Sequence, residues 1–428
     1  MKDKLLEFIM DPAQWEFEIH KGVGKGIRKD QLIQLCDPKT RIVICELIKQ
    51  SKYEVAPPTI AEIPKDDGTM REVVVNEPVD RIILGIINRG LFKLTPDMVH
   101  KNCMAYREKI SCGDVVQQIA KEMVDAKPDK DGVIGFKADL SKYFDSVPIE
   151  FIDRAFDMAE ERIGKSVVID LLRKYYHSDW YFDKDEEDKR KKKLCKRYQS
   201  LKQGCAVASW LADVVLYHID ESLSSMGSYR RYSDDILFIG KNHKTAKGYL
   251  DHALQQMGMK LNPKKVEQVK KDKWVKFLGF NIMAGEISMA KSRLKTFQKE
   301  IQARTTKAKK TTKKKAINDI NKYLYKGDGL HSWASQVLPI ITVMEDIQTM
   351  NSFIMDCIRA VETGKKRVGG LGCEVGKKKG CVTRGKGKNV KANREKTEPK
   401  IEGFMSLMMA RNAMLTRVDV YKALVMNL

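Results

Sequence analysis

Two apolar segments of the sequence carry aspartates at positions that a sheet would bury. Residues 132–140, GVIGFKADL, predict a buried strand that ends near Asp139. Residues 229–240, YRRYSDDILFIG, predict two short strands around a turn at Asp234 and Asp235. A carboxylate in an apolar setting is costly unless a cation or a hydrogen-bond donor satisfies it. The fold must therefore supply these acids with a compensating partner.

The three acids can meet if the predicted strands belong to one sheet. Asp139 and Asp234 are 95 residues apart in the sequence (234 − 139), on different predicted strands. Carboxylate oxygens suit Mg²⁺, and two such ions about 3.5–4 Å apart activate a hydroxyl and stabilise a leaving pyrophosphate. An Asp-Asp pair taken alone is more often ordinary turn chemistry. In combination, the three acids of a basic protein favour phosphoryl transfer on a nucleic acid.

The chain carries a large excess of positive charge. Its 428 residues hold 79 Lys and Arg against 57 Asp and Glu, which gives a formal net charge of +22. The commonest partner of such a chain is a polyanion, so nucleic acid is expected first and an acidic membrane surface second. The best apolar run, residues 337–344, is short and contains Pro339, whereas a spanning helix needs about 20 apolar residues. No membrane partner is therefore expected.

The cysteines and the start of the sequence bear on the compartment. Nine scattered cysteines without a CxxC pair argue against a disulfide framework and favour a reducing compartment. Glu7 and Asp11 interrupt the apolar stretch at the start of the chain, so no signal peptide is recognised. These features predict a cytoplasmic protein. Cys373 and Cys381 are too loosely spaced to predict a zinc site.

Hydrophobic periodicity predicts a mixture of helices and strands. Pro148 predicts the start of a helix that runs to about residue 162, because proline is favoured in a first helical turn. The other expected elements are helices in 1–60, 80–94, 206–222 and 243–257, hairpins in 63–78 and 178–200, and a strand in 274–280. After about residue 290, the pattern predicts helices joined by basic segments.

Two of these basic segments are candidates for binding nucleic acid. Residues 303–316 hold seven Lys and Arg and no acid, and residues 365–400 hold thirteen Lys and Arg against three Asp and Glu. The second segment has too little apolar surface to fold alone. It is predicted to be a flexible arm that orders on its ligand, with a merely solvated linker as the alternative.

Six segments follow one another in an order that resembles the reverse transcriptases. They are IPKDDGTMR (63–71), similar to the fingers motif, FKADLSKYFDSVP (136–148), the first palm motif, LKQGCAVASWLADVVL (201–216), the Gln-Gly motif, YSDD (232–235), the Tyr-x-Asp-Asp signature, LNPKKV (261–266), the lysine-bearing motif, and FLGF (277–280), the primer-grip hairpin. The resemblance covers roughly residues 60–300.

The resemblance implies an α+β right-hand polymerase with fingers, palm and thumb, in which the palm sheet is antiparallel. The expected divisions are a helical N-terminal extension at 1–60, fingers at 61–135, a palm at 136–289 with a fingers insertion at about 149–200, and a helical, basic thumb and C-terminal region at 290–428 with the flexible arm at 365–400. The implied activity is RNA-directed DNA polymerisation. Its implied partners are an RNA template, a DNA primer or product, and deoxynucleoside triphosphates.

The family motifs also imply a metal site. By resemblance, Asp139 and Asp234 hold two Mg²⁺ ions, for which Mn²⁺ is a possible substitute, and Asp235 is a further ligand or tunes the site. Lys265 is the expected proton donor to the leaving pyrophosphate, with Lys264 as its rival. Either lysine could instead simply face water.

Five further residues are expected at the nucleotide by resemblance. Lys65 and Arg71 would neutralise triphosphate oxygens, although charges on a solvated hairpin are the alternative. Phe144 would be the aromatic steric gate that excludes a 2′-hydroxyl, although ordinary core packing is the alternative. Gln203 and Gly204 would contact the nucleotide and let the template backbone come close, because glycine has no side chain to clash.

The C-terminal half supplies the expected contacts with the nucleic-acid backbone. By resemblance, the primer grip is Phe277, Leu278 and Gly279. Lysine and arginine side chains in the two basic segments would bind phosphates with little sequence reading. The expected nucleic-acid-binding residues are Lys309, Lys310, Lys313, Lys314, Lys377, Lys378 and Arg384.

One departure from the family pattern bears on the subfamily. Many relatives read Gln-Gly-x-x-x-Ser-Pro, whereas here Ala208, Ser209 and Trp210 follow and the proline is missing. With no appended domains recognised, this resembles the defence-associated branch of bacterial reverse transcriptases, called the unknown group or abortive-infection-like, whose relatives often copy a structured noncoding RNA. The alternatives are an intron-mobility or diversity-generating reverse transcriptase, or a non-catalytic RNA-binding maturase or scaffold.

Overall fold

The computed structural model describes residues 2–21, 27–65, 68–107, 110–182, 194–198, 200–326, 332–364 and 401–416. These residues form two compact units. The first comprises Met1–Glu108 and Lys127–Val269, and the second comprises Lys109–Ala126 and Lys270–Leu428. No helix in the described part of the chain is long and apolar enough to span a membrane.

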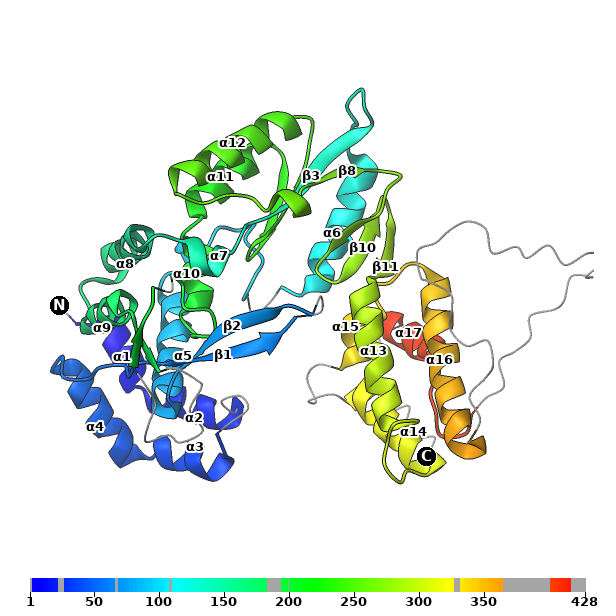
Figure 1. The fold of residues 1–428 in the computed structure, drawn as a ribbon, viewed down its shortest axis with the longest axis horizontal. Coiled ribbons are helices and arrows are strands. Elements are labelled where there is room, and N and C mark those ends of the chain that lie inside the picture. The colour runs from blue at the N-terminus through cyan, green and yellow to red at the C-terminus, as the bar shows by residue number, and fades with distance from the viewer. Residues whose placement is uncertain are drawn as a thin grey trace, which may run out of the picture. The chain divides into compact units, whose positions relative to one another are not determined.

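The first unit begins with helices α1 to α4, which are followed by α5 after the first hairpin (Figure 1). Side chains of Asp3 and Asp37 cap α1 and α4 by accepting from backbone N–H groups of their first turns. The bounds are α1 Lys4–Met10, α2 Pro12–Lys21, α3 Lys29–Leu35, α4 Pro38–Lys49 and α5 Pro78–Leu94. Helix α5 buries an apolar face and packs against α1 and α2.

A four-stranded sheet in the order β6-β7-β3-β8 forms the centre of this unit, and we call it the palm sheet. Its strands are β3 Val133–Asp139, β6 Ser228–Tyr232, β7 Asp235–Ile239 and β8 Glu267–Lys270. Every residue of β3 is buried, and β3 and β6 both pair antiparallel with β7. Helices α11 Tyr217–Met226 and α12 His243–Gln256 pack together beside this sheet (Figure 1).

A second four-stranded sheet, in the order β2-β1-β4-β5, contains the hairpin of the first motif. Its strands are β1 Thr59–Pro64, β2 Met70–Val75, β4 Trp180–Phe182 and β5 Leu194–Lys196. The remaining elements of the first unit are η1 Pro96–Met98, α7 Tyr143–Ser146, α8 Ile149–Ile163, α9 Val167–His177, α10 Ala208–Val214 and η2 Pro263–Lys265. The predicted α+β class and the predicted antiparallel palm sheet are confirmed.

The second unit pairs one helix from the middle of the chain with a three-stranded sheet and a helical region. Helix α6 packs on strands β10 and β11, and the backbone N–H of Gly285 donates to the Ala120 carbonyl at 3.0 Å. The bounds are α6 Cys112–Asp125, β9 Val275–Phe277, β10 Phe280–Met283, β11 Glu286–Met289, α13 Lys291–Arg304, α14 Lys313–Asn321, the π-helical segment η3 Lys322–Lys326, α15 Trp333–Val337, α16 Met344–Thr363 and α17 Leu407–Leu415.

Two sequence predictions about elements were wrong. The helix expected over 206–222 is two helices, α10 and α11, separated at Val215 and Leu216. The strand expected over 274–280 is the pair β9 and β10, joined by a tight turn. The four-part division into extension, fingers, palm and thumb stays a prediction, and the arm predicted at 365–400 lies outside the described residues.

Candidate active site

The register of the palm sheet brings the three predicted acids together. Strand β3 ends with Asp139 and β7 begins with Asp235, and these two residues are direct cross-strand partners. Asp234 lies in the turn between β6 and β7, and its carbonyl accepts from the Leu140 N–H at 3.0 Å. The convergence predicted for Asp139 and Asp234 from strands far apart in sequence is therefore present in the fold.

Two of the three acids, Asp234 and Asp235, are in an unfavourable electrostatic setting. Burial, together with the charge of Asp139, raises the pKa of Asp234 above its ordinary value. Burial also raises the pKa of Asp235 to about 6, with Asp234 and Asp139 adding to the rise and Lys137 opposing it. Burial is the main cause of both rises, and the neighbouring carboxylates add to it.

Two lysines partly balance the acids. The Lys265 ammonium donates to Asp139 Oδ2 at 2.7 Å, and Lys137 Nζ lies 3.9 Å from Asp235 Oδ1. Lys265 reaches Asp139 because η2 follows Asn262, whose N–H donates to the Asp139 carbonyl at 2.7 Å. Burial favours the neutral amine, but the hydrogen bond and charge of Asp139 outweigh it and raise the pKa of Lys265.

The donor chemistry of the site fits a divalent cation of the hard type. Carboxylate oxygens are the ligands that Mg²⁺ prefers, and a cation there would favour the charged forms of Asp234 and Asp235, which burial and the neighbouring carboxylates disfavour. Within the described ranges, no three His, Cys, Asp or Glu side chains already form a ligand cluster. The Lys265 ammonium contacts Asp139 Oδ2, so a cation would bind through Oδ1 or displace that contact.

The two cations predicted on the first hairpin act most strongly on different carboxylates. Arg71, on β2, is exposed, and its charge acts to lower the pKa of Asp234. Lys65 lies at the end of β1, where its N–H donates to the Thr69 carbonyl at 2.8 Å, and its charge acts on Asp145 instead. Arg71 is therefore the better placed of the two to serve the acid cluster.

Residues of the first and second palm motifs lie against the first hairpin and the core. Phe144, in α7, is half-buried and contacts the Tyr143 ring edge-on at a centroid distance of 5.7 Å. The Gln203 carbonyl accepts from the Val74 N–H of β2 at 2.6 Å. Gly204 has φ +110°, and a Cβ there would overlap the Val74 carbonyl oxygen. The backbone that Gly204 admits in this fold is that of β2, and its predicted approach to a template backbone stays a prediction.

The predicted primer grip and basic residues lie in the second unit. Phe277 is buried, and Leu278 and Gly279 form the β9–β10 turn with φ +49° and +79°. Lys309, Lys310 and Lys314 are exposed, whereas Lys313 pairs with Glu362 at 2.8 Å. The remaining predicted residues, Lys377, Lys378 and Arg384, lie outside the described residues. The roles of all ten stay predictions.

Sequence reasoning missed the charged residues that support the acids from inside the fold. Lys137 is 8% exposed although it lies in β3, and Arg231 in β6 is fully buried. A period of two along the strands was the available signal. It puts Lys137 on the same face as Asp139, and Arg231 on the same face as the buried Tyr229.

Comparisons with known proteins agree with this site. Residues 63–282 match the family described as Reverse transcriptase (RNA-dependent DNA polymerase). A search of curated proteins finds no match. The solved structures similar to the chain include two telomerases from the genus Candida. The telomerase of Candida albicans, in complex with a TWJ fragment of telomeric RNA, has a TM-score of 0.45 and 12% identity, covering 74% of this chain and 56% of that one.

The second structure is apo telomerase of Candida tropicalis truncated from the C-terminal domain, with a TM-score of 0.41 and 16% identity, covering 59% of this chain and 60% of that one. The chain thus spans less than two thirds of either structure. Both TM-scores are low, so the family assignment rests on the sequence match, which includes Asp139, Asp234, Asp235 and Lys265 and more than half of the chain. The chain belongs to the reverse transcriptase (RNA-dependent DNA polymerase) family.

Proposed function

We propose that this chain is an RNA-directed DNA polymerase that adds deoxynucleotides to a primer with two Mg²⁺ ions, or with Mn²⁺ in their place. The observation that supports this most is the β3–β7 register, which sets Asp139 opposite Asp235 with Asp234 on the adjoining turn. Asp139, Asp234 and Asp235 would hold the ions. When bound, the ions would activate the primer hydroxyl and stabilise the leaving pyrophosphate.

The chain's own residues would bind the triphosphate and donate a proton to the leaving pyrophosphate. Arg71, whose charge already acts on Asp234, would neutralise phosphate oxygens, with Lys65 on the same hairpin. Lys265 keeps its ammonium protonated beside Asp139, so it is the group that would give a proton to the departing pyrophosphate. Among the described residues, its neighbour Lys264 makes no such hydrogen bond to Asp139.

Our narrower proposal is that the template is a structured noncoding RNA and that copying it serves antiphage defence in the bacterial cytoplasm. The residues Ala208, Ser209 and Trp210, which depart from the usual Gln-Gly motif, support this branch. The exposed Lys309, Lys310 and Lys314 of the helical second unit would bind RNA phosphates. A structured RNA would be recognised by its shape, loops and 2′-hydroxyls.

The first test is synthesis by the purified chain. We expect extension of a DNA primer on an RNA template in Mg²⁺, none in EDTA, and recovery when Mg²⁺ is restored, measured on sequencing gels. We also expect the RNA that co-purifies with the chain to be one structured noncoding species accompanied by its complementary DNA. Folded protein that extends no RNA-templated primer would refute the polymerase proposal. Co-purified intron RNA, or a template repeat beside a variable gene, would replace the defence proposal with another lifestyle.

The second test concerns sugar selection by Phe144. Its ring is half-buried five residues after Asp139. If the ring contacts the sugar, Phe144→Ala should raise the relative incorporation of ribonucleotides by about 10-fold or more, because a steric exclusion of this kind is worth 1–3 kcal/mol. Single-nucleotide incorporation with matched deoxy- and ribonucleotides measures this ratio.

Phe151→Ala is the matched control for Phe144→Ala. Phe151, at the start of α8, is also half-buried and packs against the same hydrophobic core. Its replacement should lower stability by a similar amount and leave the ratio of ribonucleotide to deoxynucleotide incorporation unchanged. An unchanged ratio in Phe144→Ala as well would mean that Phe144 is only a core residue.

A further inference from the structure

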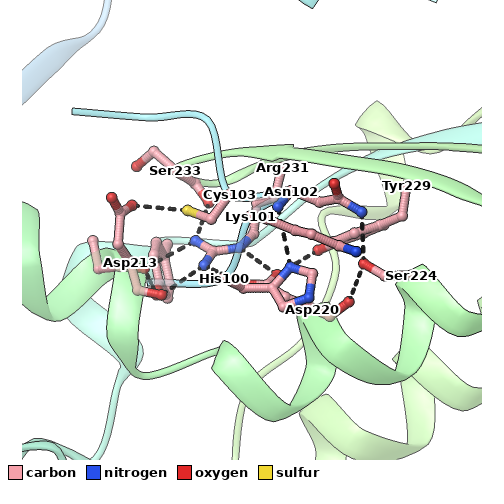
Figure 2. Close-up of polar contacts among 12 residues, drawn as sticks. His100, Lys101, Asn102, Cys103, Asp213, Asp220, Ser224, Tyr229, Arg231 and Ser233 are labelled. Atoms are coloured by element: carbon pink, nitrogen blue, oxygen red, sulfur yellow. Dashed lines mark hydrogen bonds and ion pairs between the residues drawn. The ribbon is translucent and has the colours of Figure 1, made fainter. Parts of the chain in front are cut away.

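Arg231 is a fully buried cation directly beside the turn that carries Asp234 and Asp235. It lies in β6, and its side chain is 0% exposed, as is that of its partner Asp220 on α11. The two side chains form a bidentate pair, in which Arg231 Nε donates to Asp220 Oδ1 at 2.7 Å and Nη2 donates to Oδ2 at 2.6 Å (Figure 2).

All five N–H donors of Arg231 have acceptors. The three donors that Asp220 does not use go to backbone carbonyls, those of Ala212 at 2.9 Å, Asp213 at 2.8 Å and Ser233 at 3.2 Å. A guanidinium is the one side chain with five donors in a fixed plane. A lysine has three donors and no such plane, so it cannot reproduce this set.

The partners of Arg231 are themselves held in place. Asp220 Oδ1 also accepts from the Tyr229 hydroxyl at 2.7 Å. The backbone of Arg231 is bonded on its outer side, because its N–H donates to the Asn102 carbonyl at 2.9 Å and its carbonyl accepts from the Met104 N–H at 2.8 Å. The guanidinium therefore sits in a rigid frame made of β6, the end of α10, the start of α11 and the segment 102–104.

The bond to Ser233 links this frame to the acids. Ser233 has φ +57°, a left-handed conformation that costs a residue with a side chain roughly 1 kcal/mol. Arg231 donates to its carbonyl, and the carbonyl of the next residue, Asp234, accepts from Leu140 beyond Asp139. The turn is thus held at one end by Arg231 and at the other by β3.

The energetics of a buried pair favour a positional role over a stabilising one. Removing two charges from water costs about as much as their attraction returns, so an apolar replacement of similar volume is often as stable. What an apolar side chain cannot supply is five directed donors to fixed acceptors. The Arg231–Asp220 pair is therefore better explained by the groups that it holds in place than by a contribution to folding stability.

We propose that Arg231, held by Asp220, is a positioning residue that keeps the turn at Ser233 in the conformation that presents Asp234 and Asp235 toward Asp139. The proposal rests on the polymerase function proposed above. It assigns Arg231 no contact with substrate or metal. Its effect is on how well the carboxylates bind the ions.

The variant Arg231→Lys tests this role in the full-length chain. It should remain folded by circular dichroism, raise the half-saturating Mg²⁺ concentration at least about 5-fold and lower kcat about 100-fold, because misplacement by about 1 Å costs this much. The KM for deoxynucleotide should change by less than about 2-fold. Direct titration with Mn²⁺, followed by electron paramagnetic resonance, should show the weakened metal binding without any turnover.

Arg89→Lys is the matched control, because Arg89 also pairs with a buried acid of the first unit, Glu18, away from the palm turn. It should lower the melting temperature and leave kcat and the Mg²⁺ requirement unchanged. Adding Ser233→Gly to Arg231→Lys should recover at least about 10-fold of the lost kcat, because glycine adopts positive φ without the strain. If Arg231→Lys does not fold, Asp220→Asn takes its place with the same expectations.

The outcomes separate this inference from the proposed function. Wild-type activity and Mg²⁺ requirement in Arg231→Lys would overturn the positioning role while leaving the polymerase intact. So would a loss of kcat that matches Arg89→Lys, or one that Ser233→Gly does not relieve. A wild-type chain without Mg²⁺-dependent extension would overturn the proposed function, whereas the Mn²⁺ titration would still decide whether Arg231 supports the acids.

Discussion

Asp234→Asn is expected to reduce DNA synthesis by at least about 1,000-fold while the chain stays folded. The carboxylate would hold ions that provide several kcal/mol of transition-state stabilisation, and each 1.4 kcal/mol is about tenfold in rate. The neutral amide keeps the volume of the side chain but loses the charge that binds a cation. Primer extension at saturating Mg²⁺ measures the loss, and Asp251→Asn is the control, because Asp251 is exposed on α12 and pairs with Lys247.

The stability of a further variant, Asp235→Asn, gives an independent check on the site. The folded chain raises the pKa of Asp235 to about 6 from an ordinary value of 3.8, so the folded state binds this proton more tightly than the unfolded state. The contribution of Asp235 to stability is therefore favourable at low pH and is lost as pH rises from about 4 to about 6. Asp235→Asn should remove this loss, so it should melt no lower than the wild type at pH 7.

The activity of Asp234→Asn also distinguishes a polymerase from an RNA-binding scaffold. A scaffold would keep its biological effect when Asp234 is neutralised, because RNA binding by the exposed lysines of the second unit does not need that carboxylate. A polymerase would lose both synthesis and effect. Wild-type rates of extension in Asp234→Asn would instead show that the acid cluster is not the catalytic centre.

The acid cluster could be predicted from the sequence because its determinants are local. Apolar runs around Asp139 and around Asp234 and Asp235 specify short strands, and the turn between the second pair of strands is only two residues long. A strand that ends in an acid and a hairpin with acids at its turn can meet at one edge of a sheet, so elements that short windows reveal made the convergence a possibility that the register then confirmed.

The support beneath the cluster could not be predicted in this way. Helix α10 ends at Val214 with no glycine or proline nearby, so local propensity favours one continuous helix. Carbonyls at a helix C-terminus lack partners within the helix. Near the end of α10, Arg231 supplies partners for two carbonyls, because its guanidinium donates to those of Ala212 and Asp213. The partner comes from β6, beyond α11 in the chain. The period of two in β6 places Arg231 on the same face as Tyr229 but does not show that Arg231 meets α10.

The grouping of α6 with the second unit has the same cause. Its capping box at Ser111 and Asp114 and its amphipathic face predict a helix from local sequence. The surface that it covers, however, consists of β10 and β11, more than 150 residues later in the chain. Periodicity shows that a helix has an apolar face but does not show which sheet buries that face.

Gly204→Ala is expected to be among the most destabilising single substitutions in the first unit, at about 2–4 kcal/mol. At φ +110° a Cβ is strained in any surroundings, and here it would also overlap the Val74 carbonyl and lie 3.1 Å from the Val74 nitrogen. Both contacts are backbone atoms of β2, which cannot rotate away as a side chain can. Urea unfolding followed by circular dichroism measures the change in free energy.

Gly248→Ala is the matched control, because Gly248 lies inside α12 and a Cβ there meets no atom within 4 Å. Alanine should stabilise that helix by about 0.5–1 kcal/mol.

In Gly204→Ala, relief of the overlap requires β2 to move, which breaks the 2.6 Å bond from Val74 N–H to the Gln203 carbonyl and shifts Arg71 on the same strand. The KM for deoxynucleotide should therefore rise in whatever fraction remains folded. If Gly204→Ala and Gly248→Ala have the same free energy of unfolding, the close contact between β2 and the loop at Gly204 does not constrain this residue, and its small size is needed for a different backbone contact.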